Sequence, residues 1–74
     1  MSPKPPLLSG RDLVKFFIKL GYRKVSQKGS HIKMKNDETG SVAIIPDHKE
    51  LDRWTLKSIL RDAEVYEEEL KKIL

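Results

Sequence analysis

The four residues from Lys28 to His31 bring together groups that could act on a phosphodiester. His31 is one of only two histidines in the chain, and it directly follows a glycine and a serine, residue types that favour a tight turn. Histidine exchanges protons near neutral pH and commonly serves as a general acid or base. Residues 22–35 contain five lysines and arginines and no acidic residue. This combination suits cleavage of RNA, although an ordinary exposed histidine on a basic hairpin explains the same residues.

The length of the chain allows one domain with a thin core. A chain of 74 residues buries only about 60% of its unfolded surface. We expect one domain over residues 7–74, preceded by a flexible tail over residues 1–6 that contains three prolines. The absence of cysteine excludes disulfides and thiolate metal sites. No apolar run suggests a membrane span or a signal peptide, so we expect a cytoplasmic protein with no membrane partner.

The charge of the chain is unevenly distributed. Residues 1–35 carry nine basic residues and one acidic residue, whereas residues 36–74 carry six basic and ten acidic residues. The formal net charge of +4 therefore combines a strongly basic first half with an acidic second half. Such a field favours a polyanion or an acidic protein surface as the partner and does not choose between them.

Hydrophobic periodicity predicts helices at both ends of the domain. Ser9 is a suitable N-cap for a helix over residues 10–20. Asp52 can cap a second helix that has an apolar stripe along one side. No glycine or proline interrupts residues 53–74, so this run is either one long helix or a helix with a kink near residues 64–66.

Between the helices, alternation and turn residues predict an antiparallel sheet. Its three strands are expected over residues 22–27, 31–35 and 41–45. In the middle strand Ile32 and Met34 must face the helices, because a chain this small cannot leave them in water. His31, Lys33 and Lys35 then point to the open face. The predicted fold class is α+β, with the order α-β-β-β-α and two helices on one face of a three-stranded sheet.

With these elements in order, the chain resembles the HicA family of toxin ribonucleases from residue 8 to about residue 63. The stretches that carry the resemblance are Leu8-Ser9-Gly10, Leu20-Gly21-Tyr22, Gln27-Lys28-Gly29-Ser30-His31, Pro46 with His48 to Leu51, and Thr55 to Arg61. The run that ends in His31 is the most specific of them. Each stretch alone is a weak signal, and their common order makes the match a strong one.

The resemblance implies a fold like that of a double-stranded-RNA-binding domain. It also implies cleavage of mRNA without a metal or cofactor, as the toxin of a toxin–antitoxin pair. A HicB-like antitoxin protein would neutralise the toxin by covering its active site. Carried over to this sequence, the catalytic histidine is His31. We expect the free toxin to be a monomer.

The sequence departs from the family pattern at four positions. Ile32 stands where many members have a second histidine, and Trp54 stands where a glycine is common. Glu64 and Tyr66 replace the glycine and serine that usually separate two C-terminal helices. The first departure bears on catalysis, and the other three bear on the C-terminal shape and the partner surface.

RNA supplies its own nucleophile, the 2′-hydroxyl group, so its cleavage needs a base, an acid and positive charge near the phosphate. His31 is the predicted base. Lys28 and a backbone N–H of the turn at Gly29 and Ser30 are suited to stabilise charge on the phosphate. His48 is either the second acid–base group or a loop residue hydrogen-bonded to a neighbour. Two histidines without a third ligand make a poor zinc site, so no metal site is predicted.

Basic residues on the hairpin and on the second helix are predicted to contact RNA. The full predicted set is Lys24, Lys28, Gly29, Ser30, Lys33, Lys35, Arg53, Lys57 and Arg61. The last three share one helix face, which either follows phosphates or is an ordinary solvated surface. Trp54 is interpreted as packing or a protein-contact anchor rather than a platform for bases. The acidic run at residues 67–69 is expected to face away from RNA.

Two functions besides an RNA-cleaving toxin are compatible with the sequence. One is a small RNA-binding module on the same fold that does not cleave, which the missing second histidine motivates. The other is a protein that docks an acidic surface through its basic half. Growth arrest that depends on His31 would favour the toxin, and salt-dependent RNA binding would separate the other two.

Overall fold

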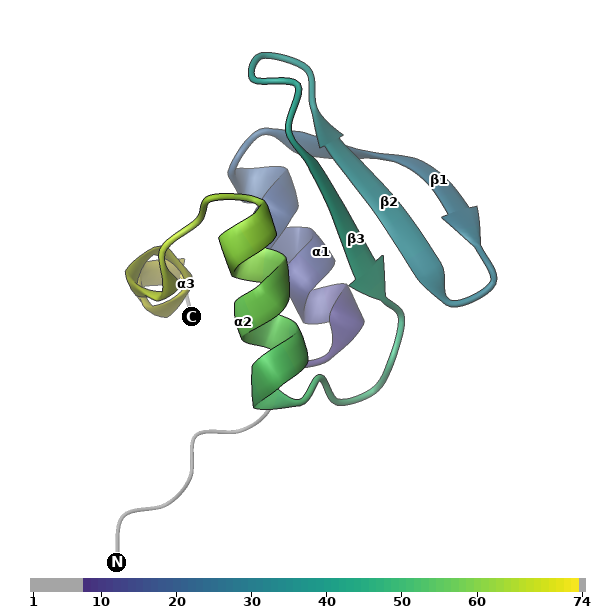
Figure 1. The fold of residues 1–74 in the computed structure, drawn as a ribbon, viewed down its shortest axis with the longest axis vertical. Helices are drawn as coiled ribbons and strands as arrows, with labels where there is room; N and C mark the ends of the chain where they lie inside the picture. Colours follow the sequence, from purple (N-terminus) through teal and green to yellow (C-terminus); the bar gives the residue numbers. More distant parts are fainter. Residues whose placement is uncertain (1–7, 74) are drawn as a thin grey trace, which may run out of the picture.

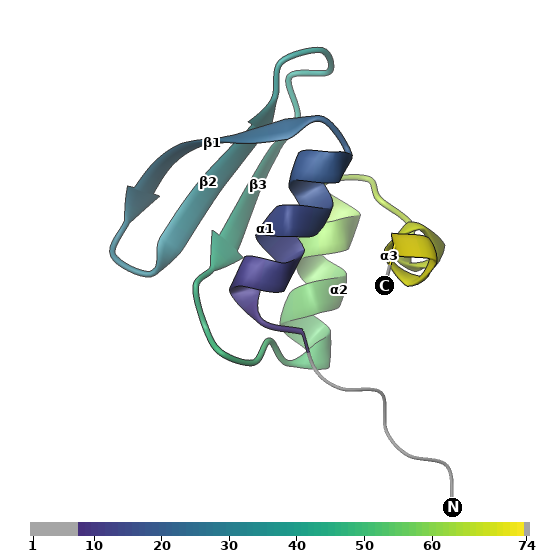
Figure 2. The same ribbon diagram turned by 180° about the vertical axis from the view of Figure 1, so that it is seen from behind.

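The computed structural model describes residues 8–73 of the chain. The elements in this range are α1 (Gly10–Lys19), β1 (Tyr22–Lys28), β2 (His31–Asn36), β3 (Val42–Pro46), α2 (Arg53–Asp62) and α3 (Glu67–Ile73). The strands form an antiparallel sheet in the order β1-β2-β3. Both α1 and α2 cover the same face of this sheet, and α3 lies on the far side of α2 (Figures 1 and 2).

The predicted fold class and the order α-β-β-β-α are confirmed, and α3 is a further helix after α2. The strands differ from the predicted ranges by one residue at most. The tail predicted over residues 1–6 lies outside the described residues. In the described range, no helix combines the length and apolar character that a membrane span requires.

Local sequence signals define both ends of α1. The Ser9 hydroxyl accepts a hydrogen bond from the Asp12 N–H at 3.0 Å, and the Asp12 carboxylate accepts one from the Ser9 N–H at 3.3 Å. This reciprocal capping box satisfies N–H groups that a helix start leaves unpaired. Gly21 follows the helix with a φ of +97°, which glycine adopts without strain.

The core lies between the sheet and the helices. Its most deeply buried large side chains are Leu13, Phe16, Phe17, Met34, Ile45, Leu51 and Leu60. The ring of Phe17 packs edge-on against Phe16 and Tyr22, with centroid distances of 5.5 and 4.8 Å. Ile32 and Met34 are buried toward the helices, as alternation predicts. Each such side chain contributes about 1.5–3 kcal/mol by leaving water, so this core holds the sheet on the helices.

Asp52 caps α2, as predicted. Its carboxylate accepts hydrogen bonds from the Thr55 N–H at 2.8 Å and from the Thr55 hydroxyl at 2.9 Å. These bonds favour the charged carboxylate and hold the pKa of Asp52 below its usual value, with the backbone bond as the largest cause. α2 therefore begins at Arg53.

The run after Asp52 is broken into two helices and is not one long helix. At the end of α2 the Glu64 N–H donates to the Arg61 carbonyl at 3.0 Å, and the Val65 N–H donates to the Leu60 carbonyl at 2.8 Å. This pair of bonds is the Schellman arrangement, which needs a left-handed residue after the helix. Glu64 takes that conformation with a φ of +57°.

Candidate active site on the open face of the sheet

His31 begins β2, the middle strand of the sheet. It lies directly opposite Lys28 on β1 and Pro46 on β3, and residues paired in this way point to the same face. Because the adjacent Ile32 is buried toward the helices, His31 points to the open face, where it is exposed. The orientation predicted from alternation agrees with the structure.

A β-bulge at Val25 brings Lys28 to the face that carries His31. The pairing of β1 with β2 is interrupted between Lys24 and Ser26, where β1 contains one extra residue. Alternation counted from the start of β1 would point Lys28 toward the helices. The extra residue reverses that alternation, and a cation therefore lies beside the histidine at the end of the hairpin.

The open face combines cations with apolar side chains. Lys33 and Lys35 follow His31 at alternate positions of β2, and all three are exposed. On β3, Ile44 lies opposite Lys33 and Val42 lies opposite Lys35. The exposed fractions of these apolar residues are 46% and 38%. This face therefore suits contact with a polyanion and with a protein surface.

One further cation of the open face, Arg23, is engaged in an ion pair. It lies opposite Lys35, and its Nε donates to the Asp37 carboxylate at 2.6 Å. This hydrogen bond is the main cause that lowers the pKa of Asp37 and raises the pKa of Arg23. Within residues 8–73, Lys28, Lys33 and Lys35 form no ion pair, so their charge is available to a ligand.

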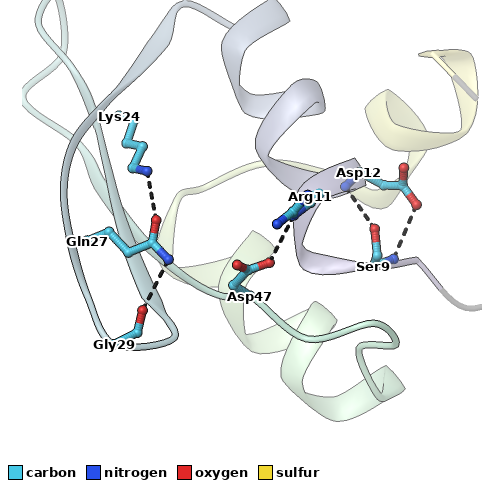
Figure 3. Close-up of polar contacts among 7 residues, drawn as sticks. All are labelled: Ser9, Arg11, Asp12, Lys24, Gln27, Gly29 and Asp47. Carbon is cyan, nitrogen blue, oxygen red and sulfur yellow. Dashed lines mark hydrogen bonds and ion pairs between the residues drawn. The ribbon is translucent and has the colours of Figure 1, made fainter.

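The turn between β1 and β2 is braced from the opposite side of the sheet. Gly29, with a φ of +58°, and Ser30 form a two-residue hairpin loop that places glycine first. The Gln27 amide donates to the Gly29 carbonyl at 3.1 Å and accepts from Lys24 Nζ at 2.7 Å (Figure 3). Lys24 and Gln27 pair with core-facing residues of β2. The structure thus separates Lys24 from His31, whereas Gly29 and Ser30 lie beside it.

Backbone hydrogen bonds hold the start of α1 and the end of β3 next to this turn. The Asp47 N–H donates to the Ser30 carbonyl at 2.6 Å, and the Gly10 N–H donates to the His48 carbonyl at 2.8 Å. A Cβ atom at Gly10 would overlap the carbonyl oxygen of Pro46. Glycine is therefore required where α1 meets the strand, and three segments meet at one end of the molecule.

His48 is exposed in the loop after β3. His48 directly follows Asp47, whose N–H donates to the carbonyl of Ser30, the residue before His31. The two histidines therefore lie at the same end of the molecule, on different segments. In the part of the chain that the structure describes, no three or more metal-binding side chains are grouped as a site.

Arg11 also borders this end of the molecule, and the sequence reasoning missed it. Its Nε lies 3.5 Å from the Asp47 carboxylate (Figure 3). The two residues line a shallow hollow whose full lining is Ser9, Arg11, Asp47, His48 and Lys49. The available signal was Gly10, because glycine in a first helical turn indicates close approach of another backbone.

The remaining predicted RNA contacts lie in the helical layer. Arg53, Lys57 and Arg61 are exposed on α2, which covers the face of the sheet opposite to His31 (Figures 1 and 2). The predicted set is therefore divided between two surfaces. Lys28, Gly29, Ser30, Lys33 and Lys35 accompany His31, and the α2 cations and Lys24 do not.

The fold and the site define a small α+β domain that presents an exposed histidine on a cationic sheet face. The chain belongs to the HicA family: the family model for the HicA toxin of bacterial toxin–antitoxin systems matches residues 10–65. A search of curated proteins finds no match. The family match runs from α1 to the turn after α2 and confirms the resemblance seen in the sequence motifs. The protein is thus a toxin of the HicA type, and such a toxin has a cognate antitoxin.

Proposed function

We propose that this toxin is an endoribonuclease that cleaves mRNA without a metal ion, with His31 as its general acid–base group. The observation that carries the proposal is the pairing of His31 with Lys28 on the open face of the sheet. Both side chains are exposed, so a phosphodiester can reach them without a change of the fold. The family, whose members are generally ribonucleases, supports the same reaction.

In the proposed reaction, His31 removes the proton of the 2′-hydroxyl group as its oxygen attacks the adjacent phosphorus. The bond from phosphorus to the 5′-oxygen breaks, which leaves a 2′,3′-cyclic phosphate and a 5′-hydroxyl end. The Lys28 ammonium group and an N–H of the turn stabilise the charge that develops on the phosphate oxygens. Positioned acid–base groups contribute about 10²–10⁴-fold to such a rate.

His48 is the proposed donor of the proton that the leaving 5′-oxygen needs. Its support is its position one residue beyond the hydrogen bond between Asp47 and Ser30, at the end of the sheet where His31 begins β2. Lys33 and Lys35 continue the cationic track along β2 and are proposed to bind the flanking phosphates, with Gly29 and Ser30 at the turn.

The departure at Ile32 does not weaken the proposal. Ile32 is 5% exposed and packs in the core, so the side chain at this position does not reach the open face. A second histidine here would lie on the helix side of β2. The loss of that histidine therefore removes no group from the face that carries His31.

The antitoxin is proposed to cover the open face. Val42 and Ile44 provide exposed apolar contact area beside Lys33 and Lys35, and an acidic rim on the antitoxin would complement the lysines. Free of its antitoxin, the toxin is proposed to act on mRNA in the cytoplasm as a monomer.

The test compares His31→Ala, His48→Ala and the unchanged protein for RNA cleavage in vitro and for growth arrest on expression. His31→Ala is expected to keep the thermal unfolding curve and to lose cleavage by about 10²-fold or more. Activity that persists in EDTA and stops when the 2′-hydroxyl at the cut site is replaced by hydrogen supports the mechanism. A folded His31→Ala protein that cleaves like the unchanged one contradicts it, and RNA binding without cleavage by the unchanged protein indicates the non-catalytic module instead.

A further inference from the structure

Two aromatic side chains of the helical layer are almost fully exposed. Trp54, in the first turn of α2, is 82% exposed, and Tyr66, just before α3, is 77% exposed. The prediction that Trp54 is a packing residue is therefore wrong, and the alternative of a protein-contact anchor stays a prediction. Burying an aromatic ring is strongly favourable, so two rings left in water at neighbouring sites indicate a surface that a ligand covers.

The two rings line the same open groove between α2 and the start of α3. The groove is lined by Trp54, Lys57, Ser58, Leu60, Arg61, Glu64, Val65, Tyr66 and Glu67. Lys57 Nζ lies 5.9 Å from the centroid of the Trp54 ring, within the range of a cation–π contact. Arg53 belongs to the same helix face, so cations run along the α2 side of the groove.

The ring of Tyr66 is not needed to cap α3. Tyr66 stands immediately before α3, at the N-cap position, where Ser, Thr, Asp or Asn would satisfy free N–H groups. Its main chain carbonyl accepts from the Glu69 N–H at 3.0 Å, a contact that any residue could make. An aromatic ring at this position therefore gives up capping stability and adds only exposed surface.

We infer that the groove binds unpaired bases of RNA, which stack on Trp54 and Tyr66 while their phosphates follow Arg53, Lys57 and Arg61. Proteins that bind single strands combine aromatic platforms with a cationic track in this way. The inference rests on the proposed function, because it takes RNA to be the substrate. It adds a second contact region on the face of the molecule opposite to His31.

The acidic residues of the groove set the direction in which the RNA lies. Glu64 and Glu67 line the α3 side, and the acidic first turn of α3 continues there. These carboxylates repel phosphates, so the sugar–phosphate backbone must follow the α2 side, with the bases between the two rings. The inference thus places RNA beside Glu67, in contrast to the expectation that the acidic run faces away from RNA.

The groove lies in the helical layer, and the scissile phosphate would lie on the open face of the sheet. RNA held in the groove therefore flanks the cleaved bond and does not react there. Removal of a ring is expected to raise the KM for a long RNA and to leave kcat unchanged.

The test uses Trp54 as its own reporter, because it is the only tryptophan in the chain. The full-length His31→Ala protein is titrated with a 12-nucleotide single-stranded adenosine RNA and with an abasic strand of equal length. The base-containing RNA is expected to quench Trp54 fluorescence in a saturable way. The abasic strand is expected to bind more weakly, measured by anisotropy, and to leave the emission unchanged.

The variant Tyr66→Ser removes one ring and supplies a capping hydroxyl, so a loss of binding cannot follow from a loss of stability. It is expected to weaken binding of the adenosine RNA about tenfold. The matched control is Ile18→Ala, which truncates an apolar side chain of α1 that is 54% exposed, and it is expected to leave affinity unchanged.

Several results would overturn the inference. They are the absence of quenching, equal quenching by the abasic strand, and a Trp54 emission that responds only to the cognate antitoxin, which would assign the groove to that protein. Quenching by RNA together with undiminished cleavage by the His31→Ala protein would support the groove and overturn the role of His31. The two proposals can therefore fail separately.

Discussion

Two turns of this molecule place a residue at positive φ, one with glycine and the other with glutamate. Gly29 at the β1–β2 turn has a φ of +58°, and Glu64 after α2 has a φ of +57°. Glycine takes this conformation without cost, whereas a residue with a Cβ loses about 1–2 kcal/mol. The end of the molecule that carries His31 is thus built without such strain and fixed by backbone bonds. The junction that positions α3 and the aromatic groove also has backbone hydrogen bonds, but it carries the strain of Glu64 at positive φ.

The largest expected loss of stability follows from adding a side chain at Gly10, at the end of the molecule that carries His31. Gly10→Ala places a Cβ on the Pro46 carbonyl, and neither backbone segment can move without breaking the bond from Gly10 to His48. We expect a loss of about 3 kcal/mol or more in the free energy of unfolding, measured by urea denaturation. Cleavage should fall even where the protein is folded, since the segment next to the β1–β2 turn must shift.

The control for this variant is Gly40→Ala. Gly40 has a φ of +76°, and a Cβ there meets no atom within 4 Å. Only the conformational cost of about 1–2 kcal/mol is expected, with cleavage retained. Equal losses for the two variants would show that the contact of α1 with Pro46 is not a rigid constraint.

A smaller effect is expected when α3 is detached from the core. Leu70 is 6% exposed and belongs to the core cluster, and truncation of a buried leucine to alanine costs about 2–5 kcal/mol. We expect the cost of Leu70→Ala to lie near the lower limit of this range, because α3 is short and near the end of the described chain. Hydrogen exchange should show loss of protection confined to α3, with β2 unchanged.

That result would show that the two regions unfold independently. Cleavage at His31 should then persist, while quenching of Trp54 fluorescence by RNA should be reduced. Loss of protection across β2 as well would show that α3 supports the sheet, and the contrast between the regions would not hold.

Substitutions at the two positive-φ positions, Glu64 and Gly29, are expected to change the free energy of unfolding in opposite directions. Glu64→Gly is expected to raise the free energy of unfolding by about 1 kcal/mol, and Gly29→Ala to lower it by about the same amount. Chemical denaturation of both variants measures the two changes in the free energy of unfolding. A destabilised Glu64→Gly protein would mean that contacts of the Glu64 side chain outweigh the strain.

The sequence predicted the elements well where local chemistry decides them. The capping residues Ser9 and Asp52 mark the helix starts, and alternation around His31 assigns its face. The break after α2 was left open because its usual signal, a glycine, is replaced by Glu64. The Schellman bonds form in spite of this, since Leu60 and Val65 pack in or against the core on either side of the turn.

The candidate site was predictable only in part, because two of its features depend on pairing between distant segments. Nothing local to Val25 indicates an extra residue in β1, yet this bulge places Lys28 beside His31. Arg11 reaches the end of β3 only because α1 packs on Pro46. Exposure of Trp54 could not be read from a helix whose partners were unknown.

The smallest expected effect concerns two carboxylates whose pKa values the fold lowers. Asp37 accepts from Arg23 beside the sheet, and Asp52 accepts from Thr55 at the start of α2. Because folding lowers both pKa values, their contribution to stability is complete above the unfolded value of about 3.9 and is lost as the pH falls through the folded values.

Asp52→Asn keeps an amide oxygen that can cap α2 and removes the titration. The variant is therefore expected to lose less of its thermal stability than the unchanged protein between pH 6 and pH 3. Asp37→Asn should reduce the pH dependence less, because its partner is an exposed arginine and salt screens that pair. Repeating the pH series in 1 M salt should reduce the contribution of Asp37 more than that of Asp52, because Asp37 accepts from a charged side chain and Asp52 accepts from a neutral backbone N–H. Equal sensitivity to salt would show that both groups act only through exposed charge.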